Sequence, residues 1–224
     1  MLATPLLVGV LASSPAWVHL SLTGFWFAGY FAFFAAGLWL KSRRKVRYLP
    51  PVRTYGLIAV GLGALTVALQ PGLLRWAPLF VVPLGIGLFA SATRHERSLV
   101  SGLATTASSS LMTLVAYDAG GGTDWPRAWF LAAVLFAYFG GTVVYVKTMI
   151  RERGSRAHYA LSVAWHVVAA LALARRSGLL AAVFGLLAVR SAIFPRLRLT
   201  PKTVGLVELG ATLLLAWVAL TAPL

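Results

Sequence analysis

Long apolar segments follow one another along this chain with only short breaks, and this pattern decides its fold class. A helix needs roughly 20 apolar residues, with a range of about 17–25, to cross the hydrocarbon core of a bilayer. The runs are continuous rather than alternating, which excludes membrane-spanning strands. Nine segments can be read: Met1–Ala12, Trp17–Leu40, Thr54–Gln70, Leu74–Ala92, Ser98–Tyr117, Ala128–Val146, His158–Ala174, Gly178–Val189 and Thr203–Leu220.

The breaks between the segments contain residues that interrupt helices, such as Pro50-Pro51 and Pro71-Gly72. Most breaks are too short to hold a soluble domain. We therefore predict an all-α fold, a polytopic transmembrane bundle of nine helices that forms a single domain over residues 1–224. The first and eighth segments are short, and we expect the eighth either to continue as a helix through Arg190–Phe194 or to be partly re-entrant.

The composition agrees with a membrane protein. Charged residues make up 11% of the chain and hydrophobic residues 59%, whereas a soluble domain carries about 25% charge. The net charge of +15 would indicate nucleic-acid binding in a soluble protein. Here the basic residues lie between apolar segments, so topology explains them and we expect no nucleic-acid partner. The absence of cysteine excludes disulfides and thiolate chemistry.

The basic residues also predict the orientation of the chain. Sixteen of the 20 Lys and Arg residues fall in the loops 41–53, 94–97, 147–156 and 190–202, which follow the second, fourth, sixth and eighth segments. Loops rich in Lys and Arg stay in the cytoplasm. This predicts a protein of the cell membrane with a cytoplasmic N-terminus and an outside C-terminus.

Ionisable residues inside membrane segments are costly and are candidates for function by default. Glu208 lies in the last segment and His166 in the seventh, both in the cytoplasmic half, and Glu96 and Glu152 lie in loops on the same side. We take these four as candidate catalytic residues, although no complete catalytic motif is present and the question of an enzyme stays open. The alternatives are an ion pair between Glu208 and an arginine of an inside loop, and a hydrogen-bonded interhelical His166.

An anion site is predicted at the end of the sixth segment. Lys147 and Arg151 are four residues apart and share a helix face, and Glu152 and Arg156 have the spacing of a stabilising helical pair. Arginine and lysine bind phosphate or carboxylate groups by charge-assisted hydrogen bonds. Lys147, Arg151 and Arg94 form the predicted anion-binding set. The alternative is that the basic residues of this segment only set the topology and that Glu152 and Arg156 stabilise the helix.

The loop 41–53 is the most basic segment, with six Lys and Arg residues. We expect it to hold the chain's orientation and to attract anionic lipid headgroups, so the predicted partners are the bilayer and anionic lipids. Contact with a substrate phosphate is the sharper alternative.

Four stretches of the chain carry a resemblance: Arg94–Leu99, Ala116-Tyr117, Gly141–Arg156 and Leu161–His166. Together they resemble the YwiC-like family of bacterial membrane proteins, over nearly the whole chain. The resemblance implies a multipass membrane protein but no particular chemistry or cofactor. Family members usually carry a His-Gly-Ala-Trp stretch before the first apolar run. It is missing here, so we expect that Met1 is an internal start or that the chain is truncated.

Nine spans with polar cytoplasmic loops after the second and sixth also resemble, more distantly, the UbiA-type intramembrane prenyltransferases. Those enzymes hold Mg²⁺ on a prenyl diphosphate with Asp-rich motifs in both loops. Here the loop 41–53 contains no acid and the loop 147–156 contains only Glu152. We therefore expect no metal site, because Mg²⁺ needs carboxylate oxygens, and an anionic headgroup held directly by Arg and Lys.

These observations favour a membrane protein that binds an anionic amphiphile or lipid at a basic, cytoplasm-facing cavity. The alternatives are a UbiA-like transferase without the metal motifs, a proton-coupled transporter that uses Glu208 and His166, and an assembly factor without chemistry. A transferase would need an apolar cleft open to lipid and lined by aromatic residues such as Phe25, Trp26 or Tyr30. A transporter would often show inverted repeats.

Overall fold

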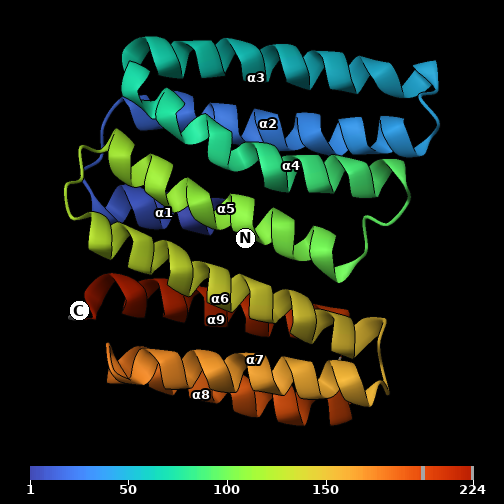
Figure 1. Ribbon diagram of the computed structural model, residues 1–224, viewed down its shortest axis with the longest axis vertical. Helices are drawn as coiled ribbons and strands as arrows, with labels where there is room; N and C mark the ends of the chain where they lie inside the picture. The colour runs from blue at the N-terminus through green and yellow to red at the C-terminus, as the bar shows by residue number, and fades with distance from the viewer. Residues whose placement is uncertain (198–199, 223–224) are drawn as a thin grey trace. The chain divides into compact units, whose positions relative to one another are not determined.

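Helices make up nearly all of the chain, and the residues that the structure describes contain no strand. A computed structural model describes residues 1–197 and 200–222. Its α-helices (Figure 1) are α1 (Ala3–Ala12), α2 (Val18–Lys41), α3 (Leu49–Leu69), α4 (Ala77–Ala92), α5 (Leu99–Ala119), α6 (Trp125–Ile150), α7 (Arg156–Ala174), α8 (Gly178–Ile193) and α9 (Pro201–Thr221). Short 3₁₀ turns add η1 (Val46–Tyr48), η2 (Pro71–Trp76) and η3 (Phe194–Arg196). The all-α prediction is confirmed.

The nine apolar segments become helices, but the first is too short to cross a membrane. Within the described ranges, eight helical segments are long and apolar enough to span. Helix α1 has ten residues and covers about 15 Å at 1.5 Å per residue, which is half of a hydrocarbon core of about 30 Å. The eighth segment continues as a helix to Ile193 and into η3, so it is the extended helix rather than a re-entrant one.

Contacts divide the chain into two compact units, Met1–Ala132 (unit 1) and Ala133–Leu224 (unit 2). Helix α6 contains the boundary, so its first turns belong to unit 1 and the rest to unit 2. Each unit is described by itself below. The single domain and the sidedness of the termini stay predictions.

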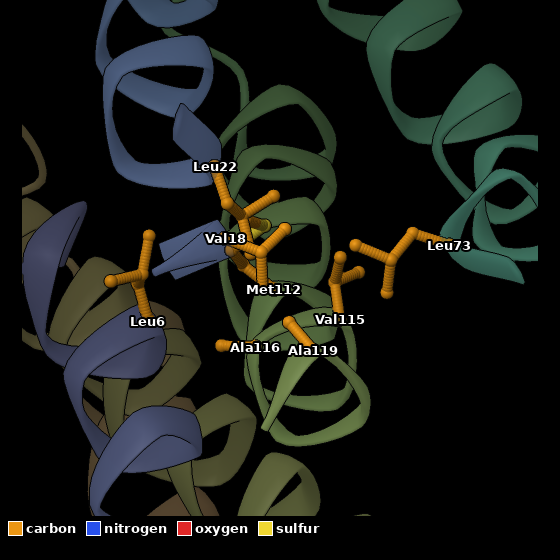
Figure 2. Close-up of a cluster of buried hydrophobic side chains, with 8 residues drawn as sticks. All are labelled: Leu6, Val18, Leu22, Leu73, Met112, Val115, Ala116 and Ala119. Carbon is orange, nitrogen blue, oxygen red and sulfur yellow. The ribbon is translucent and has the colours of Figure 1, made fainter. Parts of the chain in front are cut away.

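The core of unit 1 is built around α5. Helices α1 and α4 pack on α5, and α2 packs on α3 and α4. Figure 2 shows one buried cluster at this junction, formed by Leu6 of α1, Val18 and Leu22 of α2, Leu73 of η2, and Met112, Val115, Ala116 and Ala119 of α5. Helix α1 comes so close to α5 that a Cβ on Gly9 would lie 2.4 Å from the carbonyl oxygen of Thr113. This close approach lets a short helix bury one side completely.

The two ends of unit 1 are each fixed by an ion pair. At one end, Lys41 at the end of α2 pairs with Glu96 in the loop between α4 and α5. At the other, Arg75 Nη2 lies 2.7 Å from Asp118 Oδ1, and Trp76 Nε1 donates to Asp118 Oδ2 at 2.8 Å. The basic loops 41–53 and 94–97 therefore lie at the same end of unit 1, as the alternation of basic loops predicts.

Unit 2 holds the remainder of α6 together with α7, α8 and α9. Helix α7 packs on α8, and α8 on α9. Trp165 Nε1 donates to Ala137 O at 2.7 Å and joins α7 to α6. At one end of the unit, Tyr159 is hydrogen-bonded to Ala192 O at 3.1 Å and accepts from Arg196 at 3.2 Å. The loop before α7 and the turn after α8 therefore lie at the same end.

Candidate functional site

A buried ion pair between α8 and α9 is the centre of the polar residues in unit 2. Arg190 Nη1 contacts Glu208 Oε1, and the two side chains are only 7% and 15% exposed. A charge within the membrane is costly unless it is paired, so each residue explains the other. The ion-pair alternative for Glu208 is thus what the structure contains.

The second oxygen of Glu208 faces α6. Thr142 donates to Glu208 Oε2 at 3.2 Å. The hydroxyl of Tyr138 lies 2.9 Å from Thr212 Oγ1 and donates to the main-chain oxygen of Glu208 at 3.1 Å. These bonds hold the carboxylate in one orientation and connect α9 to α6 at this level.

Arg190 is also in contact with an aromatic ring. Its guanidinium carbon lies 4.1 Å from the centre of the Tyr145 ring, and Tyr145 is fully buried. Such a cation–π contact adds about 2 kcal/mol when it is desolvated. The guanidinium is therefore held on one face by α6 and at one nitrogen by α9.

His166, on α7, lies next to Ser191 of α8 and is fully buried. Its Nδ1 lies 2.7 Å from Ser162 O and 3.1 Å from Ser191 Oγ. A carbonyl oxygen can only accept, so Nδ1 carries the hydrogen and Nε2 of the neutral ring is an acceptor. Ser191 follows Arg190 on α8, so two consecutive residues of α8 contact the two embedded residues that the sequence singled out.

The remaining predicted residues of unit 2 lie at the end of α6. Lys147 is half-buried and Arg151 is exposed, whereas the carboxylate of Glu208 is bound by Arg190 and Thr142. That the helix face of Lys147 and Arg151 borders the same polar cavity as Glu208 or His166 stays a prediction.

The predicted helical pair of Glu152 with Arg156 is wrong. Helix α6 ends at Ile150 and α7 begins at Arg156, and Gly154 between them has a φ of +89°. The two residues therefore share no helix. Instead, Oε2 of Glu152 lies 3.7 Å from Nδ1 of His158.

The predicted residues of unit 1 lie in the loop between α4 and α5. The Lys41 ammonium donates to Glu96 and lowers the pKa of that carboxyl, so Glu96 is ionised at neutral pH. Arg94, two residues earlier, has a φ of +62°, which places it in the tight turn that ends α4. Both residues are therefore at the same end of unit 1 as the basic loop 41–53.

An aromatic groove of about 450 Å³ lies beside that basic loop. Its lining comes from α2, η1 and α3: Tyr30, Phe31, Phe34, Ala35, Leu38, Tyr48, Pro51 and Tyr55. The volume is within the range of ligand pockets, about 300–1,000 Å³. We call this feature the aromatic groove. It includes Tyr30, one of the three aromatic residues expected in a lipid-facing cleft, but not Phe25 or Trp26.

Sequence reasoning missed Arg190 as a site residue, because the eighth apolar segment was ended at Val189 and Arg190 was assigned to the following loop. Continuing the helix to Phe194, which was one of the two expectations, would have placed Arg190 inside the span. Tyr138 and Tyr145 carry no signal in an aromatic-rich segment. In the described part of the chain, no three His, Asp or Glu residues are grouped as a metal site would need.

Comparisons with known proteins agree with the resemblance. Residues 1–117, just over half of the chain, match a family model described as YwiC-like protein. An uncharacterized protein of Haemophilus influenzae is 25% identical over 218 residues, covering 95% of this chain and 90% of the relative. The uncharacterized protein YwiC of Bacillus subtilis is 28% identical over 169 residues, covering 75% and 70%. No solved structure matches the chain.

Proposed function

Since this chain belongs to the YwiC-like protein family, we propose that it is a membrane protein that holds an anionic amphiphile in unit 1. The apolar chain lies in the aromatic groove and the anionic headgroup lies at the basic loop 41–53. The observation that carries this proposal is that one residue, Tyr48, both lines the groove and contacts a cation of the loop.

The groove suits an apolar chain. Phe31 packs its ring 5.3 Å from that of Tyr55 and 5.6 Å from that of Tyr30, so the wall is formed by aromatic faces from both α2 and α3. The groove is open, since Phe34 is 57% exposed. Each methylene that leaves water for such a surface contributes about 0.8 kcal/mol.

The basic loop suits the headgroup. The Arg47 guanidinium lies 4.9 Å from the centre of the Tyr48 ring, and its Nη2 donates to the Tyr48 hydroxyl at 3.1 Å. Arg43 and Arg44 have φ angles of 59° and 61°, so the loop turns tightly back at the end of α2. A basic residue beside an anionic headgroup contributes about 1 kcal/mol. Arg94, at the same end of unit 1, is a further cation for the headgroup.

The test is the retention of lipid by the purified protein in a neutral detergent. Native mass spectrometry with equal amounts of phosphatidylglycerol and phosphatidylcholine should show phosphatidylglycerol retained preferentially. Phe31→Ala should lower retention of this lipid, whereas the matched variant Phe89→Ala should not, because Phe89 lies on α4 outside the groove and is 71% exposed. Arg47→Gln should reduce the preference for the anionic lipid. Equal loss in Phe31→Ala and Phe89→Ala, or equal retention of both lipids by the unmodified protein, would contradict the proposal.

One observation favours a second candidate, the UbiA-like transferase. An open aromatic groove that includes Tyr30 is what this alternative requires. The assay is release of diphosphate from a prenyl diphosphate, measured with and without added Mg²⁺. If no diphosphate is released under either condition, the transferase is excluded and lipid binding remains as the proposed function.

A further inference from the structure

We propose that the buried guanidinium of Arg190 in unit 2 is a binding site for an oxyanion, a carboxylate or a phosphate. The anion is held by the Nε–Nη2 edge of the guanidinium. This site goes beyond the proposed function, because it is formed by other residues in the other unit and does not depend on the aromatic groove.

The hydrogen bonds of Arg190 identify the free edge. Glu208 is bound at Nη1, whereas Nε and Nη2 are buried and have no hydrogen-bond partner among the described residues. Nε–H and one Nη2–H point in parallel from the same edge of the planar group, and this fork matches two oxygens of a carboxylate or phosphate. The Arg190 side chain is only 7% exposed. A buried charged donor left without an acceptor is strongly disfavoured, so the edge needs an occupant with acceptor oxygens.

One further unsatisfied polar group belongs to a ring that lies against this guanidinium. The Tyr145 hydroxyl is buried without a hydrogen-bond partner in the described chain, although its ring lies against the guanidinium. Helices α6 and α8 therefore each bring an unsatisfied hydrogen-bond donor to this contact. Buried polar groups in folded proteins are nearly always satisfied, so an acceptor beside the guanidinium is what both donors lack.

The charges indicate how the occupant is held. Arg190 and Glu208 neutralise one another, so Glu208 opposes an incoming anion while it holds the guanidinium in place. Removing the negative charge of Glu208 should therefore strengthen binding, whereas removing the forked edge of Arg190 should abolish it. A purely structural ion pair predicts neither effect on a ligand, which makes the two variants a sharp test.

The experiment measures the thermal stabilisation of the purified full chain in a neutral detergent by added anions. The probes are inorganic phosphate and acetate as free anions, and dodecyl phosphate and laurate as amphiphilic ones. The unmodified protein should be stabilised by at least one probe. Stabilisation by the free anions indicates a soluble ligand, and stabilisation by the amphiphilic probes alone indicates a headgroup at this site if Arg190→Lys loses it.

Arg190→Lys keeps a positive charge for Glu208 but has no forked edge, and it should weaken the response about tenfold or more. Arg196→Lys is the matched control, since Arg196 is exposed and bonds Tyr159 instead. Glu208→Gln should bind several-fold more tightly, and circular dichroism checks that each variant is folded. With inorganic phosphate and acetate, which have no apolar chain for the groove, Phe31→Ala should respond as the unmodified protein does, which separates this site from the groove. No response to any of the four probes, or an equal response in Arg190→Lys and Arg196→Lys, would overturn the proposal.

Discussion

Replacing Gly141 with alanine should destabilise unit 2, because α6 and α7 leave no room for a methyl group there. A Cβ on Gly141 would lie 2.7 Å from Nε2 of His166 and 2.8 Å from Cδ1 of Trp165. Neither ring is free to move away, because His166 Nδ1 is bonded to Ser162 O and Trp165 Nε1 to Ala137 O, both at 2.7 Å. Ordinary contact begins at 3.4 Å, so the rings must shift by roughly 0.7 Å and strain both bonds.

The magnitude follows from three contributions. Overpacking a filled interior costs about 1–3 kcal/mol, and weakening two buried hydrogen bonds adds about 1 kcal/mol. Alanine recovers about 0.5–1 kcal/mol of helix propensity relative to glycine. The free energy of unfolding should therefore fall by about 2 kcal/mol. Gly185→Ala on α8 is the control, because nothing lies within 4 Å of its Cβ and only the propensity gain remains.

The measurement is reversible unfolding of the detergent-solubilised protein by sodium dodecyl sulfate, followed by circular dichroism and tryptophan fluorescence. The free energies of Gly141→Ala and Gly185→Ala should differ by about 3 kcal/mol. If Gly141→Ala is as stable as Gly185→Ala, the close contact of α6 with the two rings of α7 is refuted.

Two other contacts and the predicted orientation lead to measurable outcomes. Lys41→Ala should raise the pKa of Glu96 toward 4.5, because the hydrogen bond from Lys41 is the largest cause of its lowering. The stability from ionised Glu96 is present above its unfolded pKa and is lost as the pH falls through the lowered folded value, so unfolding scans on either side of pH 4.5 should show a smaller acid loss in Lys41→Ala. Gly9→Ala should speed hydrogen exchange in α1, since its Cβ would lie 2.4 Å from a main-chain oxygen of α5. Cysteines at Ser42 and Ser155 should be labelled from the same side of the membrane, and labelling from opposite sides would contradict the orientation.

The helices could be predicted from the sequence because each corresponds to a continuous apolar run of neighbouring residues. The boundaries of α2, α5 and α7 fall within a few residues of the predicted segments. Helix α1 shows the limit of this reasoning. Its apolar run begins at Met1, two residues before the helix does, and the ten-residue helix covers only half of the hydrocarbon core.

The partners within the site were harder to predict. Glu208 was found because a lone acid stands out in an apolar segment, but hydropathy does not say which of the inside arginines it meets. That choice depends on how α8 packs on α9, which brings residues 18 positions apart into contact. The Glu152–Arg156 pair failed for a local reason, since the helix ends before Gly154 and i,i+4 geometry exists only within one helix.

The pairing of Arg190 with Glu208 has a consequence for how the chain enters the membrane. An unpaired arginine within an apolar helix disfavours its insertion, less in the last turn, where Arg190 lies, than at the centre, and an isolated Glu such as Glu208 is likewise expensive in hydrocarbon. Helices α8 and α9 each bear one such residue, so each inserts less readily alone than its apolar residues by themselves would allow. Entering together as a hairpin, with the opposite charges already joined, they bring no net charge into the lipid. We therefore expect α8 and α9 to insert together, because α8 alone would place Arg190 in the bilayer without its counter-ion.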